Sequence, residues 1–144
     1  MSAGGPDTPR LAPVRLLPQT AELARLRRAV AAWAVSCRLP ETAARRLVQA
    51  ADEAAANAIE HGLSDPARSR IVVSAEPTPD GLTVRLRYRG PRFDPTSAPA
   101  AGPSEAVRQR AVHGYGLLLI RRLVAHVGHD YARGINEVRL TARR

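Results

Sequence analysis

The fold of this chain is decided by the segment Asp52–Gly62, which reads DEAAANAIEHG. Its run of small residues predicts a helix that can lie close against a sheet, with Ala55 and Ala58 among the packing positions. Gly62 is a natural stop for that helix. We expect the helix to begin near Pro40, with the proline in its first turn, and to run to His61.

Two polar side chains of this segment point to a metal. Glu53 and Asn57 are four residues apart, so they share one face of the helix. A carboxylate and a carboxamide together offer oxygen ligands that suit Mg²⁺, which takes one or two protein oxygens and keeps several waters. Phosphate oxygens of a nucleotide would complete its coordination. A solvated helix face that binds no ligand is the alternative for this segment taken alone.

The second informative segment is His113–Ile120, which reads HGYGLLLI. Gly114 and Gly116 precede an apolar helix that we expect over Tyr115–Val127. Glycines there permit close backbone approach, and free N–H groups at a helix start bind anions well. The third glycine and the preceding strand of the dinucleotide fingerprint are missing. An ordinary loop-to-helix turn is the alternative for this segment.

The remaining elements follow from hydrophobic periodicity and turn residues. Apolar residues at helical spacing predict a helix over Thr20–Cys37, with Thr20 as its N-cap. Alternating residues predict short strands over 15–17, 71–76, 82–88, 128–132 and 137–141. The turns of the two expected hairpins are Thr78–Gly81 and Arg133–Asn136. In the strand 82–88, one face is expected to carry Leu82, Val84, Leu86 and Tyr88.

This order of elements predicts an α+β fold. We expect a two-layer sandwich, with one mixed β-sheet covered on one face by about three helices. Residues 1–10 are rich in Gly, Pro, Ser and Asp and are expected to form a disordered tail, followed by a single domain over 11–144. Residues 91–113 are proline-rich, and a loop of that length in a small domain is usually functional. We therefore expect a lid there.

Composition narrows the class of protein. A chain of 144 residues is long enough for one domain with a real core. All 22 basic residues are arginine, which excludes lysine chemistry, and the formal charge is +9. The arginines are scattered and aromatic residues are few, so a nucleic-acid interface is disfavoured. Without an apolar run that could span a bilayer or a signal sequence, we expect a cytoplasmic protein. Cys37 is expected to be a small buried hydrophobe.

The motifs in this order resemble the GHKL (Bergerat-fold) ATPases. More narrowly, they resemble the bacterial anti-sigma-factor serine kinases of partner-switching systems, a histidine-kinase-like ATPase domain. DEAAANAIEHG at 52–62 is similar to that family's N-box. RGPRFDP at 89–95 and HGYGL at 113–117 lie where the family has its two glycine boxes. The resemblance covers roughly residues 15–142.

The resemblance implies a role for each matching position. Asn57 would hold Mg²⁺, and Glu53 would be the general base that takes the proton from a serine of the protein substrate. The phosphates of ATP would lie on Gly114, Tyr115, Gly116 and Leu117, beneath a lid at 91–113. The partners would be a sigma factor and an anti-anti-sigma protein of the STAS type, and the resemblance also suggests a homodimer.

The first glycine box departs from the family pattern. Its adenine-binding aspartate is replaced by Tyr88, Gly90 is retained, and the next glycine is replaced by Arg92. Losing a charged hydrogen bond to the base costs about 1.5–3 kcal/mol, which corresponds to roughly 10- to 150-fold in affinity. Tyr88 either lines the adenine pocket, by stacking or through its hydroxyl, or fills it. Arg92 either reaches the phosphates or is merely exposed.

Three hypotheses therefore remain open. The leading one is an ATP-dependent serine kinase that acts as an anti-sigma factor. The second is a degenerate member of the same fold that binds protein partners without nucleotide. The third is a basic nucleic-acid-binding domain.

Overall fold

A five-stranded antiparallel sheet, in the order β1-β2-β3-β5-β4, forms one layer of the protein. The computed structural model describes residues 11–94 and 120–144. The strands are β1 (Val14–Leu16), β2 (Ile71–Thr78), β3 (Gly81–Arg89), β4 (His126–Ala132) and β5 (Ile135–Arg143). Each neighbouring pair runs antiparallel, so the prediction of a mixed sheet is corrected in this detail for the described strands. The α+β class itself is confirmed.

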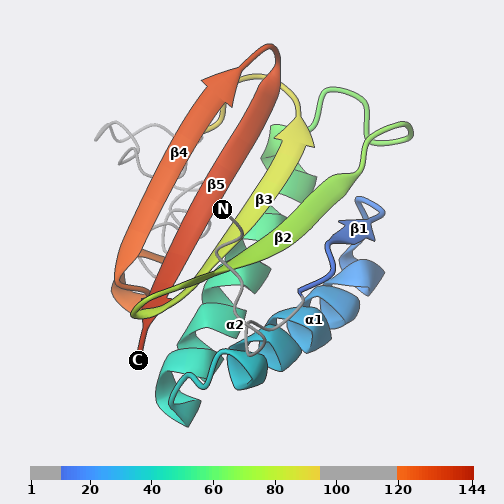
Figure 1. Ribbon diagram of the computed structural model, residues 1–144. Helices are drawn as coiled ribbons and strands as arrows, with labels where there is room; N and C mark the ends of the chain where they lie inside the picture. Colours follow the sequence, from blue (N-terminus) through green and yellow to red (C-terminus); the bar gives the residue numbers. More distant parts are fainter. Residues whose placement is uncertain (1–10, 95–119) are drawn as a thin grey trace, which may run out of the picture.

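Two long helices form the second layer, on one face of the sheet (Figure 1). They are α1 (Leu23–Ser36) and α2 (Glu41–Asn57), and α2 lies behind the central strands β3 and β5. The 3-10 turn η1 (Thr20–Glu22) precedes α1, and the π-helical turn η2 (Ala58–Gly62) continues α2. Alanines at four buried positions of α2 allow its close approach to the sheet: Ala50, Ala51, Ala54 and Ala55.

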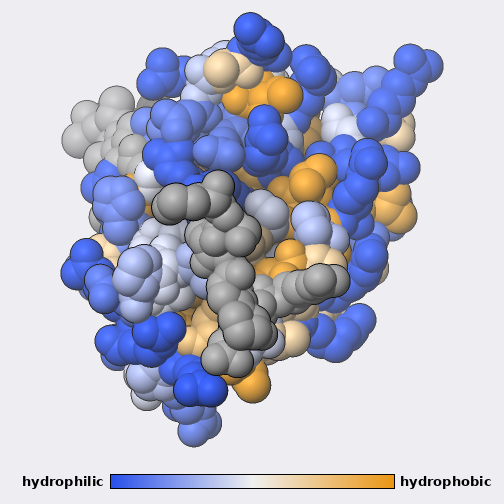
Figure 2. Space-filling view, in the orientation of Figure 1, coloured by the Kyte–Doolittle hydropathy of each residue, from blue (hydrophilic) through white to orange (hydrophobic). Residues whose placement is uncertain are grey.

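The core lies between these layers and follows the strand alternation. Leu82, Val84, Leu86 and Tyr88 of β3 are all buried, as the sequence predicts. They pack in one cluster with α1 side chains, Trp33 among them. Cys37 is buried in the same cluster, and burial raises the pKa of its thiol, which fits a packing role. The opposite face of the sheet carries polar side chains over much of its area (Figure 2).

Helix boundaries differ from the prediction at three places. The Thr20–Cys37 helix starts as η1, and no side chain caps η1 or α1, so Thr20 is not an N-cap. Pro40 is the N-cap residue of α2 rather than part of its first turn. The last helix was expected to reach Val127, but residues 120–123 end it and His126 opens β4. Strand pairing with β5 overrides helical periodicity there, and His126 and Val127 are consequently strand residues.

The hairpin turns are shorter than predicted. Pro79 and Asp80 join β2 to β3, and Arg133 and Gly134 join β4 to β5. Arg133 and Gly134 both have positive φ, 54° and 78°, as a two-residue type I′ turn requires. Asn136, expected in the turn, therefore lies in β5 with its side chain on the buried face.

Within the described ranges, no helix combines the length and apolar character needed to cross a membrane.

Candidate functional site

The end of α2 presents a buried carboxamide with an unsatisfied donor. Asn57 is only 5% exposed, and its Nδ2 has no hydrogen-bond partner among the described residues. Leaving a buried polar atom unpaired costs about 1–3 kcal/mol, so such a group calls for an explanation beyond packing. The carboxamide also carries an oxygen of the kind that Mg²⁺ takes as a ligand. The unpaired Nδ2 is a donor and cannot bind a cation, so the metal-binding role of Asn57 rests on its oxygen and stays a prediction.

The two carboxylates of α2 nearest to Asn57, Asp52 and Glu53, have different surroundings. Asp52 accepts a 2.8 Å hydrogen bond from Arg27 of α1, and this ion pair ties the two helices together. Glu53 lies one helical turn before Asn57 and is partly exposed. Glu53 shares a helix face with Asn57, four residues further on, whereas Asp52 contacts α1.

Close backbone contact joins the end of α2 to the end of β3. A Cβ at Gly90 would lie 1.7 Å from the carbonyl oxygen of Gly62, so only glycine fits at position 90. A Cβ at Gly62 would in turn lie 2.7 Å from Cε2 of Tyr88. The predicted N-box and first glycine box are thus neighbours in space, and their glycines are what permits the approach.

Tyr88 occupies the space beneath this contact. Its side chain is buried, with 3% of the residue exposed, and it belongs to the hydrophobic core. Burial raises the pKa of its phenol well above the ordinary value. The ring therefore packs under Gly62 as a core residue, at the position where the family has its base-binding aspartate. Of the two roles left open for Tyr88, filling the pocket agrees better with this burial.

A second buried carboxamide fastens the loop that follows β3. Asn136 of β5 is fully buried; its Oδ1 accepts a 3.0 Å hydrogen bond from the backbone N–H of Phe93. Its Nδ2 donates a 2.8 Å hydrogen bond to the carbonyl of Pro91. Nε2 of His129 also lies 2.8 Å from Oδ1 of Asn136. Because Oδ1 is an acceptor, the geometry requires the His129 tautomer that carries the proton on Nε2.

Three further contacts hold the same loop. The hydroxyl of Tyr131 donates to the carbonyl of Gly90 at 3.0 Å, and Nδ1 of His129 lies 3.7 Å from Oδ1 of Asp94. The ring of Phe93 stacks on that of His61 in η2, with centroids 6.1 Å apart. The loop 90–94 is therefore bound both to strands β4 and β5 and to the turn after α2.

The structure brings together only part of the predicted site. Tyr88 and Gly90 meet Gly62, five residues after Asn57 in the chain; Glu53 lies one turn before Asn57, and Arg92 is exposed. The predicted phosphate-binding residues Gly114, Tyr115, Gly116 and Leu117, and the lid beyond residue 94, lie outside the described residues. In the described part of the chain, no three His, Cys, Asp or Glu side chains are grouped as metal ligands.

Sequence reasoning missed the residues that hold the loop. His129 falls in the expected strand 128–132 and Asn136 in the expected turn 133–136, and neither prediction connects them with the first glycine box. The sequence does contain one signal for Asn136. It stands in register with Val138, Leu140 and Ala142, the apolar residues that form the buried face of β5. A polar residue at such a position has to find buried partners.

A five-stranded antiparallel sheet backed on one face by two long helices defines an α+β domain. The family model described as "Histidine kinase-like ATPase domain" matches residues 16–142, and the chain belongs to this family. Membership in an ATPase family implies ATP binding.

Among solved structures, the chain is similar to the RsbU and RsbW domains of Rv1364c from Mycobacterium tuberculosis. The TM-score is 0.60 at 21% sequence identity, over 92% of this chain and 32% of that one. This likeness supports the fold, and the chain spans about a third of that protein's length. The comparison with curated proteins gave no match.

Proposed function

We propose that this protein is an ATP-binding anti-sigma regulatory factor that phosphorylates a serine of an anti-anti-sigma protein. The observation that carries the proposal is Asn57, a buried carboxamide with an unsatisfied Nδ2 at the end of α2. The resemblance of the three motifs to anti-sigma kinases supports it, as does the likeness to a structure that contains an RsbW domain.

In this proposal, the chain's own residues position the reactants. Asn57 would hold Mg²⁺, which supplies charge stabilisation to the phosphates, and Glu53 would accept the proton of the substrate serine. Gly114, Tyr115, Gly116 and Leu117 would bind the phosphates through backbone N–H groups. Phosphoryl transfer depends mainly on positioning and electrostatics, so these groups are sufficient in a chain that has no lysine.

A second candidate function is favoured by Tyr88. Its ring is buried beneath Gly62, so the base-binding half of the site is narrowed in this conformation. A member of the family with a closed base pocket would bind its protein partners without turning over ATP. The fold would then serve as a binding module for a sigma factor or a STAS-type protein.

A phosphoryl-transfer assay separates the two functions. The purified chain is incubated with Mg²⁺-ATP and a panel of STAS-type proteins, and serine phosphorylation is followed by mass spectrometry. We expect phosphorylation by the natural chain, and its loss in Glu53→Gln with partner binding retained. Glu41→Gln, the same change at an exposed position of α2, is the matched control and should keep activity.

The opposite result favours the binding module. If partners bind equally well to the natural chain, Glu53→Gln and Asn57→Ala, and no serine is phosphorylated, the kinase proposal is wrong.

A further inference from the structure

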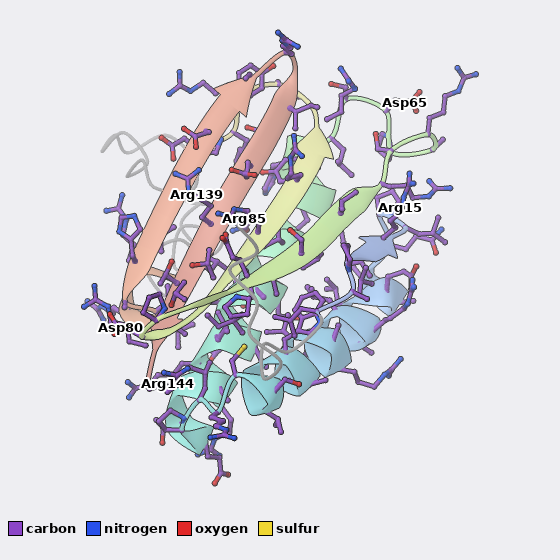
Figure 3. All side chains as sticks on the ribbon, in the orientation of Figure 1. Arg15, Asp65, Asp80, Arg85, Arg139 and Arg144 are labelled. Carbon is purple, nitrogen blue, oxygen red and sulfur yellow. The ribbon has the colours of Figure 1, made fainter. Side chains whose placement is uncertain are left out.

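Five arginines line a cavity of about 400 Å³, whose lining also includes Tyr88 near the end of β3. They are contributed by β1, by the segment before β2, and by β3: Arg15, Arg68, Arg70, Arg87 and Arg89. Val72 and Ile135 line the cavity with them. Figure 3 shows Arg15 on β1, at the same edge of the molecule as the Asp65 loop.

Strand register explains why the arginines gather on one face. Val72 of β2 pairs with Arg15 on one side and with Arg87 on the other. Their neighbours Leu16 and Leu86 are buried under the helices, so Arg15 and Arg87 project from the opposite face of the sheet. Arg89, two residues beyond Arg87, shares that face.

The segment before β2 supplies the remaining cations. The hydroxyl of Ser69 donates a 2.6 Å hydrogen bond to the carbonyl of Asp65, which closes a turn. Arg68 and Arg70 flank that serine, and all three residues line the cavity. The turn therefore sets two guanidinium groups beside those on the strands.

Carboxylates of the protein balance only part of this charge. Arg68 lies 3.9 Å from Asp65, and Arg87 lies 3.7 Å from Glu137, which also binds Arg139. In contrast, Arg15, Arg70 and Arg89 make no ion pair with any carboxylate in residues 11–94 or 120–144. Like charges held close together on a sheet destabilise it, so an anion in the cavity would relieve this repulsion.

We propose that this cavity binds a phosphate-bearing anion, either a free phosphate compound or a phosphorylated side chain of a protein. Guanidinium groups match the geometry of phosphate oxygens with paired hydrogen bonds. The volume falls in the range of small-ligand pockets. Single-stranded nucleic acid is disfavoured because it needs aromatic rings on which bases stack, and the ring of Tyr88 is buried in the core. This inference does not depend on the proposed kinase activity.

Pyrophosphate is the probe, because it carries the phosphate oxygens that a free phosphate compound and a phosphorylated side chain have in common. It is titrated into the natural chain in EDTA, which silences any metal-dependent phosphate site, and binding is followed by calorimetry. Arg70→Gln and Arg89→Gln should each weaken binding by roughly tenfold or more, since each removes a charge-assisted hydrogen bond. Both residues are exposed, so the variants should fold, which circular dichroism checks. Arg28→Gln, an exposed site on α1, is matched in charge and should bind like the natural chain.

Other outcomes would overturn the proposal. Equal weakening by Arg28→Gln would mean that only net charge matters. Loss of binding in Asn57→Ala, with Arg70→Gln and Arg89→Gln unaffected, would place the anion at the candidate nucleotide site. No binding of pyrophosphate or of a phosphoserine peptide would also refute it. If the proposal holds, tighter binding of the phosphopeptide than of pyrophosphate identifies a protein source, and the reverse order identifies a free phosphate compound.

Discussion

Replacing Asn57 with leucine should make the ligand-free protein more stable while removing its response to Mg²⁺-nucleotide. Asn57→Leu keeps roughly the same volume and removes the buried Nδ2 that has no partner. Relief of that unpaired donor is worth about 1–3 kcal/mol, and leucine is the better helix former by about 0.5 kcal/mol. Fitting a branched apolar side chain in place of the planar carboxamide costs part of this, so we expect a net gain of about 1 kcal/mol.

The assay for this prediction is thermal and urea unfolding, with and without Mg²⁺-ADP. A gain of about 1 kcal/mol corresponds to a rise in Tm of about 2–6 °C for a domain of this size. Gln49→Leu makes the same chemical change at an exposed position of α2, and it should alter stability by less than about 0.5 kcal/mol. A fall in stability of Asn57→Leu by 1 kcal/mol or more would refute the reasoning, because the carboxamide would then be a structural group.

Three further predictions concern the contact between α2, β3 and the loop that follows. Gly90→Ala should unfold the contact region or lower Tm strongly, since its Cβ would overlap the Gly62 carbonyl; an unchanged melting curve would contradict the geometry. Asn136→Ala should cost about 2–4 kcal/mol in urea unfolding, because it leaves the Phe93 N–H, the Pro91 carbonyl and His129 without their partner. The raised pKa of Tyr88 means that the folded state keeps the phenol protonated while the unfolded chain ionises near pH 10. Its contribution to stability is thus complete below about pH 10 and is lost as pH rises above it; Tyr88→Phe should flatten that decline, and an identical pH profile would speak against the burial.

The sequence predicts those parts of the fold where local pattern and tertiary packing agree. The alternation of Leu82, Val84, Leu86 and Tyr88 identifies the buried face of β3 because that strand is covered on one side only. The small residues and terminal glycine of the N-box predict the course of α2. In both places a single periodicity runs through the whole element, and nothing competes with it.

Prediction fails where long-range pairing decides the structure. The apolar residues up to Val127 fit a helix. Pairing of Val127 with Leu140, however, places the last two positions of that expected helix at the start of β4. Local pattern also does not reveal the order of strands across the sheet, which brings β5 beside β3. The predicted mixed sheet is therefore wrong in this detail for the described strands.

In the candidate site, too, residues in local motifs can be predicted from the sequence, and residues that act through long-range contacts cannot. Asn57 and Gly90 are recognisable from their motifs, since each motif is local in sequence. Asn136 and His129 are not, because they act on a loop more than thirty residues away through a network that only the folded sheet assembles. The burial of Tyr88 likewise depends on Gly62 from another element.

The most direct test of the central claim is a nucleotide titration of the natural chain with and without Mg²⁺, followed by thermal unfolding. We expect ATP and ADP to raise Tm in the presence of Mg²⁺, little effect in EDTA, and no Mg²⁺-dependent rise in Asn57→Ala. Tyr88→Asp, which restores the carboxylate typical of the family, should tighten nucleotide binding relative to the natural chain. No shift of the natural chain at millimolar nucleotide would contradict the proposal that Asn57, at the end of α2, holds the metal of an ATP site.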